Sequence, residues 1–284
     1  MNIQRIAAFS DAGAGGNPAG ILIADHFPDE VEMRRIAKVV GYSETAFAMP
    51  DGAADRWRIR YFSPESEVPF CGHATIALGA ALAEHAGNGR FALRLNSAEI
   101  TVEAEATASG YRVALQSPPT HSAAARAGLV EQALALFGYD KVRLDPALSP
   151  AEIHAGADHL VMALKHRRDL AAMTYDLGAG RKLMRENGLV TIMFVHVRSN
   201  TAFDVRNAFA SGGVLEDPAT GAAAAAFAGY LRDLKWPHGN RIEIIQGEDM
   251  RAKSRIEAEL GDEPGSSIRI SGHTRLIEPE DSTR

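Results

Sequence analysis

The sequence predicts an α+β protein made of two similar halves. In both halves, short apolar segments are separated by turn residues, a pattern typical of β-strands. Each half also contains a run of small residues entered through a glycine, PFCGHATIALGAALA at 69–83 and PATGAAAAAFAGYL at 218–231. The segment Ser117-Pro118-Pro119 breaks the pattern between them. We therefore expect an N-terminal half, residues 1–118, and a C-terminal half, residues 119–284, whose last strand can pack back on the first half.

The first half begins with an apolar strand and a glycine-rich turn, and continues as a mixture of strands and helices. Apolar residues recur at helical spacing over 29–40, whereas WRIRYF at 57–62 alternates as a half-buried strand does. The predicted strands are 3–9, 21–24, 46–49 and 57–62, the predicted helices are 29–40 and 72–86, and a strand meander follows at 91–116.

The second half begins with a predicted helix at 128–137, and its acidic segment EDPATG leads into the second run of small residues. When the two runs are aligned, Cys71-Gly72 lies over Thr220-Gly221, which indicates a duplication. The alternative is chance, because alanine-rich helices resemble one another easily. The predicted strands are 159–164, 189–197, 202–206, 241–246, 254–260 and 267–271.

Composition and charge exclude several classes of protein. The chain has 284 residues, of which 46% are hydrophobic and 23% are charged, as in globular proteins with a substantial core. Its net charge of −6 and lack of a basic cluster argue against nucleic acid as a partner. One cysteine excludes an internal disulfide, and no CxxC or HExxH spacing indicates a metal site. Without a signal-peptide core or a membrane-spanning run, the protein is expected to be cytoplasmic, with no membrane partner.

The entrances of the two small-residue helices are candidate binding sites. The first turn of a helix leaves N–H groups without internal partners and carries partial positive charge, so it binds carboxylates well. Gly72 and Gly221 would let a ligand approach the backbone closely. Two such helices facing each other would hold an acidic small molecule between their ends. The alternative is a pair of ordinary buried helices whose entry turns contain glycine.

Several motifs occur in a characteristic order along the chain: GNPAG, YSETAF, EVPFCGHAT and LEDPATGAA, the last of them preceded by RNAF and followed by IIQG. From about residue 5 to about residue 275, the sequence resembles the PhzF-like (phenazine biosynthesis protein) family. That family shares the diaminopimelate-epimerase fold with cofactor-independent epimerases and racemases. The resemblance implies two pseudo-symmetric halves, each a β-barrel-like sheet around a central helix, with the active site in the cleft between them.

The resemblance also implies three catalytic residues: Glu44 of the SETAF motif as acid/base, with His73 and Asp217 in support. A carboxylate leading into an apolar segment is expected to be partly buried, which suits general acid–base catalysis near neutral pH. Each residue has another interpretation. Glu44 could be a surface residue or a helix cap, His73 a hydrogen-bonded structural histidine, and Asp217 a cap ahead of Pro218.

Further residues are expected to bind the substrate. Cys71 stands where epimerase relatives carry one of two catalytic thiols, but its mirror position is Thr220, so a two-thiol racemase mechanism is excluded. Cys71 could be a thiolate at the helix entrance or a small packed residue. Asn17 resembles a family residue near the cleft, although it could equally be a turn residue. Backbone N–H groups are expected to come from Gly72, Ala74, Gly221 and Ala222.

Two positions depart from the family pattern. Ala222 replaces a common serine whose hydroxyl can bind substrate, and MRAKS at 250–254 replaces a Gly-Arg pair. The first departure argues against simply transferring the phenazine-pathway substrate, dihydro-hydroxyanthranilate, to this protein.

The predicted function is therefore an isomerase or epimerase that moves a proton on a small carboxylate substrate. No metal, nucleotide or flavin is required, and GAGG at 13–16 lacks the GxGxxG spacing of a dinucleotide site. The resemblance also allows a homodimer. The alternatives are other lyase or racemase chemistry on the same fold, and a non-catalytic protein that binds small acids. A Cys/His hydrolase is disfavoured, because residues 71 and 73 at a helix start are expected to have poor geometry for such a pair.

Overall fold

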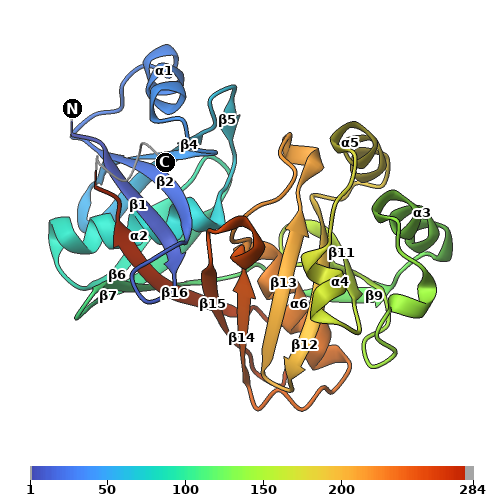
Figure 1. Cartoon of the computed structure of the whole chain (residues 1–284). Coiled ribbons are helices and arrows are strands. Elements are labelled where there is room, and N and C mark those ends of the chain that lie inside the picture. The colour runs from blue at the N-terminus through green and yellow to red at the C-terminus, as the bar shows by residue number, and fades with distance from the viewer. Residues whose placement is uncertain (1, 279–284) are drawn as a thin grey trace. The chain divides into compact units, whose positions relative to one another are not determined.

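The chain forms two compact units in the computed structural model, which describes residues 2–278. Of these residues, the first unit comprises 2–116 and 271–278, and the second comprises 117–270 (Figure 1). Each unit contains its own set of β-strands and its own buried central helix. Among the described residues, no helix has the length and apolar character needed to cross a membrane.

The sheet of the first unit closes on itself. Its strands follow the order β1-β2-β3-β4-β6-β7-β8-β16, and β1 also pairs with β16, Ile6 lying opposite Leu276. The last strand of the chain thus joins the barrel of the first unit. The strands are β1 (Gln4–Ser10), β2 (Asn17–Ile23), β3 (Thr45–Asp51), β4 (Ala53–Phe62), β5 (Glu67–Val68), β6 (Gly89–Arg94), β7 (Glu99–Thr107), β8 (Gly110–Gln116) and β16 (Arg269–Leu276).

Helix α2 (Gly72–Ala86) runs through this barrel, and its residues 73–83 are all buried (Figure 1). Small side chains are required because the strands approach the helix closely. A Cβ atom on Gly79 would lie 2.6 Å from Val113 Cγ1 and 2.8 Å from Val102 Cγ2, closer than packed atoms tolerate. Helix α1 (Glu30–Val40) packs through its apolar stripe against Phe47 and Phe62.

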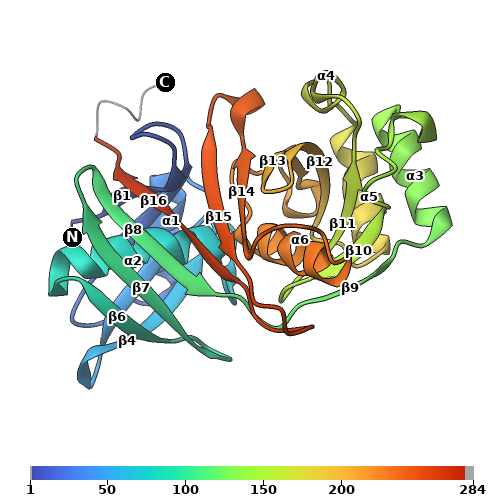
Figure 2. The same ribbon diagram turned by 90° about the horizontal axis from the view of Figure 1, so that it is seen from below.

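The second unit has a mixed sheet that curves around helix α6 (Gly221–Asp233), as Figure 2 shows. The strand order is β15-β14-β13-β12-β11-β10-β9, and the pairs β11/β12 and β13/β14 are parallel. Phe227 of α6 meets Phe203 of β13 edge to face, with ring centroids 5.0 Å apart. The strands are β9 (His121–Ala124), β10 (Ala151–His154), β11 (Asp158–Ala163), β12 (Thr191–Ser199), β13 (Ala202–Ala208), β14 (Arg241–Gln246) and β15 (Ser254–Glu259).

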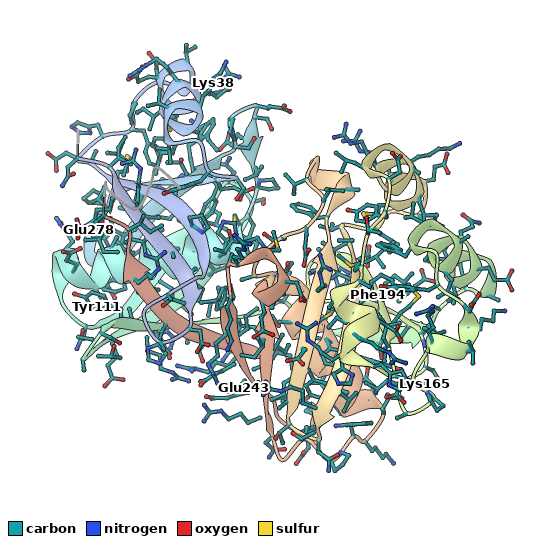
Figure 3. All side chains as sticks on the ribbon, viewed as in Figure 1. Lys38, Tyr111, Lys165, Phe194, Glu243 and Glu278 are labelled. Atoms are coloured by element: carbon teal, nitrogen blue, oxygen red, sulfur yellow. The ribbon has the colours of Figure 1, made fainter. Side chains whose placement is uncertain are left out.

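A second apolar core covers the other face of this sheet. It contains helices α3 (Ala127–Phe137), α4 (Arg167–Ala171) and α5 (Leu177–Glu186). Phe194 of β12, labelled in Figure 3, is fully buried there and contacts the rings of Phe137 and Tyr139, with centroids 4.7 and 5.3 Å away. Short 3₁₀ turns lie at Lys141–Arg143, Ala210–Gly212 and Glu248–Met250.

These features confirm the predicted fold class, with a β-barrel-like sheet and a central small-residue helix in each unit. The interpretation of Asp217 as a helix cap is wrong. Helix α6 begins at Gly221 and its N-cap is Thr220, so Pro218 lies before the helix and not in its first turn.

Candidate active site

Glu44 lies in the short connection between α1 and β3, and its backbone is held by the sheet. The Gly20 N–H donates a hydrogen bond to the Glu44 carbonyl, with an N···O distance of 3.2 Å. Only glycine permits this approach, because a Cβ atom at position 20 would lie 2.8 Å from Thr45 Oγ1 and 2.9 Å from Val40 Cγ1. The GNPAG and SETAF motifs therefore meet in adjacent strands, and their contact fixes the position of Glu44.

The Glu44 side chain, 17% exposed, lies beside the entrance of α2. Its Oε2 atom is 3.4 Å from His73 Nε2, and it accepts a hydrogen bond from the Cys71 thiol at 3.6 Å. Cys71 Sγ is 3.3 Å from His73 Nδ1, and Ser43 Oγ is 3.4 Å from His73 Nε2. A carboxylate, a thiol and an imidazole thus converge within hydrogen-bond distance. We call Glu44, Cys71 and His73 the α2 cluster.

A buried hydrogen-bond chain holds the start of α2 in place. The Thr75 hydroxyl donates to the Cys71 carbonyl at 2.7 Å, and its oxygen lies 2.6 Å from the Tyr61 hydroxyl. Burial raises the pKa of Tyr61 well above its ordinary value, so its hydroxyl stays protonated as a donor. The Cys71 side chain makes no capping hydrogen bond to the backbone N–H groups of the first turn of α2. The first-turn N–H groups therefore stay available for a ligand.

At the entrance of α6 the corresponding polar groups bond to one another. The Thr220 hydroxyl donates to Asp217 Oδ2 at 2.5 Å, and its N–H donates to Gln246 Oε1 at 3.3 Å. The Gln246 amide in turn donates to the Asp217 carbonyl at 2.7 Å and to Thr220 Oγ1 at 3.1 Å. We call Asp217, Thr220 and Gln246 the α6 cluster.

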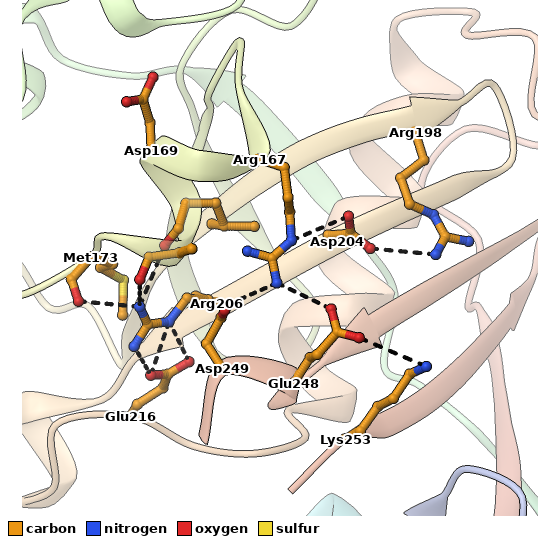
Figure 4. A network of polar contacts seen from close by, with 12 residues as sticks. Arg167, Asp169, Met173, Arg198, Asp204, Arg206, Glu216, Glu248, Asp249 and Lys253 are labelled. Atoms are coloured by element: carbon orange, nitrogen blue, oxygen red, sulfur yellow. Dashed lines mark hydrogen bonds and ion pairs between the residues drawn. The ribbon is translucent and has the colours of Figure 1, made fainter. Parts of the chain in front are cut away.

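An ion pair anchors the loop that carries Asp217 (Figure 4). Arg206 donates to both oxygens of the Glu216 carboxylate, with Nη2–Oε2 at 2.6 Å and Nε–Oε1 at 3.1 Å. The same guanidinium donates to the carbonyls of Ala171 and Met173 at 2.9 and 3.1 Å. With both side chains largely buried, this bidentate pair fixes the loop next to Asp217. The Glu216 carboxylate thus has a structural role as the ion-pair partner of Arg206.

The structure places the other predicted binding residues as follows. Asn17 is 2% exposed and lies at the start of β2, where it pairs with Ala8 in the ladder. Gly72, Gly221 and Ala222 are partly exposed in the first turns of their helices, whereas Ala74 is buried. The prediction that the two helix ends face each other across a shared cleft stays a prediction.

The structure adds residues to the site that the motifs alone did not indicate, and it corrects the prediction for one pair of residues. Ser43, Arg206 and Gln246 were not singled out, although all three lie in or beside motifs already noted, YSETAF, RNAF and IIQG. The expectation that residues 71 and 73 have poor pairing geometry is wrong. The extended backbone of Cys71, with φ −144° and ψ 115°, turns its thiol toward the imidazole that follows.

The fold and the site together define a class of protein: an α+β barrel around a buried helix, with a carboxylate, a thiol and an imidazole at the helix entrance. Solved structures share this fold. A phenazine biosynthesis protein of the PhzF family from Bacillus anthracis has 22% identity, a TM-score of 0.85 and 98% coverage of both chains. A probable proline racemase from Agrobacterium radiobacter has 12% identity and a TM-score of 0.64, covering 97% of this chain and 90% of its own.

The sequence comparisons identify the family. The family described as phenazine biosynthesis-like protein matches residues 6–278, and this chain belongs to it. An uncharacterized isomerase of Mesorhizobium japonicum is 30% identical, over 93% of each chain. A trans-2,3-dihydro-3-hydroxyanthranilate isomerase of Pseudomonas fluorescens is 29% identical, over 96% of this chain and 95% of its own. The chain is thus an isomerase of this family, as the sequence motifs predicted.

Proposed function

We propose that this isomerase moves a proton within a small carboxylate substrate by general acid–base catalysis, without a cofactor. Glu44 is the proposed base. One observation carries the proposal: the partly buried Glu44 carboxylate lies 3.4 Å from His73 Nε2, beside the first turn of α2. A base and a set of N–H donors at one helix entrance are what proton abstraction next to a carboxyl or unsaturated group requires.

In the proposed reaction Glu44 takes a proton from a carbon next to the activating group. The electrons of the broken C–H bond move into the adjacent π system, and the N–H groups of Gly72 and Ala74 stabilise the charge that develops there. Glu44 then returns the proton to another carbon of the same molecule, so the substrate is isomerised and nothing is consumed. His73 orients the Glu44 carboxylate or donates to the substrate.

Two features bear on the substrate. Phe70, immediately before Cys71, is 38% exposed and offers an aromatic face to a ring or an unsaturated chain. Ala222 removes a hydroxyl that many relatives have in the first turn of α6, which argues against a substrate identical to that of the Pseudomonas fluorescens enzyme. We therefore propose an unsaturated or cyclic carboxylate with fewer polar groups. Asp217 supports the reaction through Thr220, whose hydroxyl it binds.

Deuterium uptake in heavy water tests the proposal. A panel of cyclic, unsaturated and amino carboxylic acids is incubated with the protein, and incorporation is followed by NMR and mass spectrometry. We expect at least one acid to take up deuterium at carbon, and Glu44→Gln to lose that exchange. Glu65→Gln, which changes an exposed glutamate of the same unit, is the matched control and should exchange like the wild type.

Two other functions give different results in the same experiment. A non-catalytic binding protein, which Ala222 favours, would bind an acid in both the wild type and Glu44→Gln but show no exchange in either. Other lyase or racemase chemistry on this fold would show exchange that depends on Glu44, with a different product. Exchange that survives in Glu44→Gln would overturn the assignment of the base.

A further inference from the structure

We infer that the α2 cluster is a binding site for a thiophilic divalent metal ion, with Zn²⁺ the best fit. Glu44 Oε2, Cys71 Sγ and a ring nitrogen of His73 all lie within 4.8 Å of one another. Thiolate, imidazole and carboxylate are the three side-chain groups that zinc binds most often. The spacing of residues along the sequence could not indicate this site. Cys71 and His73 lie at the start of α2, whereas Glu44 lies far from them in the sequence, between α1 and β3.

The distances fit a tetrahedral zinc ion. With zinc–sulfur bonds of about 2.3 Å and zinc–nitrogen and zinc–oxygen bonds of about 2.0–2.1 Å, the ligand atoms of a tetrahedral ion stand about 3.3 Å (N to O) and about 3.6 Å (S to N or O) apart. In the structure Nε2–Oε2 is 3.4 Å, Sγ–Oε2 is 3.6 Å and Sγ–Nε2 is 3.9 Å. Three ligands are therefore nearly in place before any ion binds.

The charges of the ligand groups and their partial exposure to solvent also suit a divalent ion. A thiolate and a carboxylate together neutralise a charge of +2, so the occupied site carries no net charge. Binding breaks the Cys71 S–H bond, and the proton passes to solvent as the zinc–sulfur bond forms. Cys71 and Glu44 are partly exposed, which leaves a fourth position for water or another ligand.

Metal binding and proton transfer exclude each other at this cluster, because the ion would occupy the Glu44 oxygen that takes the proton. Zinc should therefore inhibit the isomerase reversibly. That consequence rests on the proposed function, whereas the binding itself does not. The described residues offer one other candidate cluster, His121, His154 and Asp158, which lies on the surface and contains no sulfur. Its lack of sulfur allows the two clusters to be told apart.

Cobalt spectroscopy and zinc titration of the metal-free protein test the inference. We expect Co²⁺ to give a sulfur-to-cobalt charge-transfer band, and Zn²⁺ to abolish it by competition. Cys71→Ser should lose the band, and Cys71→Ser and Glu44→Gln should each weaken zinc binding at least about ten- to hundred-fold, since changes even outside the ligand set have such effects. His154→Ala is the matched control and should leave the band unchanged.

Circular dichroism confirms that each variant is folded before it is titrated. A missing band in the wild type, or zinc affinity that survives in Cys71→Ser and falls in His154→Ala, would overturn the inference and place the ion at the surface cluster. Zinc binding that persists while deuterium exchange is absent would leave the metal site standing and refute the proposed function alone.

Discussion

The two central helices have the same kind of entrance but opposite chemistry. At the α2 entrance, Glu44, Cys71 and His73 are ionisable groups at distances of 3.3–3.9 Å. At the α6 entrance, Asp217 is bonded to the Thr220 hydroxyl, and Gln246 takes up the Thr220 N–H. The α2 entrance thus combines three ionisable groups, whereas the one ionisable group of the α6 cluster, Asp217, is hydrogen-bonded within that cluster. The proposed reaction therefore uses Glu44 as its base, while hydrogen bonds hold the polar groups of the α6 cluster in fixed positions.

Replacing His73 tests the α2 cluster with the largest expected effect. We expect His73→Gln, which keeps an amide near the Nε2 position, to lower kcat about 10²-fold or more, as the loss of an acid–base partner does. A change in the pH profile of kcat should accompany it, because a merely structural histidine would leave that profile in place. His85→Gln, at the far end of the same helix, is the control. Near-normal kcat in His73→Gln would mean that Glu44 needs no imidazole.

The second unit contains a buried histidine outside its α6 cluster, and its titration should control acid stability. Burial lowers the pKa of His159 to about 4, and its Nδ1 lies 2.7 Å from Thr191 Oγ1. In the unfolded chain this histidine has its ordinary pKa of about 6.5. Between that pH and pH 4 the unfolded chain therefore binds a proton that the buried ring of the folded chain does not bind. Stability from the neutral ring is therefore present above pH 6.5 and is lost as the pH falls toward 4, by roughly 3 kcal/mol.

Unfolding by urea between pH 7 and pH 4 checks this expectation. His159→Asn keeps a polar atom near Thr191 but does not titrate, so its free energy of unfolding should fall less steeply with acid than that of the wild type. Parallel curves for the two proteins would show that His159 does not cause the acid sensitivity.

The two central helices differ in the chemistry of their entrances, but we expect the packing around them to be equally tight. A Cβ atom on Gly79 of α2 would lie 2.6 Å from Val113 Cγ1, and one on Gly229 of α6 would lie 2.6 Å from Thr120 Oγ1. We expect Gly79→Ala and Gly229→Ala each to lower the free energy of unfolding by about 1–3 kcal/mol through overpacking. Gly128→Ala, where the added atom meets nothing within 4 Å, is the control. A large effect in one helix alone would argue against equivalent packing.

The smallest effect is expected at Ala222. Residue 222 is partly exposed in the first turn of α6, and Ala222→Ser introduces the serine that the resemblance to the family predicts at this position. One new hydrogen bond of about 1 kcal/mol should strengthen binding of hydroxylated ring carboxylates about five-fold. Isothermal titration of the wild type and the variant measures it. No change would mean that position 222 does not contact the substrate.

The sequence predicted the two central helices and most strands because their signals are local. The run from Gly72 to Ala86 and its entrance motif specify one helix, and the strand at 57–62 shows simple alternation. Helix α5 was not predicted, because Gly178 and Gly180 interrupt its pattern. The structure explains Gly180 by packing, since a Cβ atom there would lie 2.4 Å from Tyr175 Cε2. That Cβ atom would also lie 3.1 Å from Ala210 Cβ, and a contact with so distant a segment leaves no local signal in the sequence.

The sequence predicted which residues belong to the candidate site, but not how they contact one another. Motif resemblance selected Glu44, His73 and Asp217, yet the contact of Cys71 with both Glu44 and His73 depends on how the chain enters α2. Arg206 lies in a motif that was noted, but its role appears only where it meets Glu216 and the carbonyls of another loop. Long-range polar contacts of this type require the folded structure.

In the proposed function, the α2 entrance moves the proton and the α6 entrance does not. Solvent deuterium exchange into the bound acid, measured at saturating substrate for Glu44→Gln and Asp217→Asn, tests it most directly. We predict that Glu44→Gln loses about 10³-fold or more of the exchange rate, within the range of general acid–base catalysis, while Asp217→Asn mainly weakens binding. Exchange that persists in Glu44→Gln and disappears in Asp217→Asn would contradict the account.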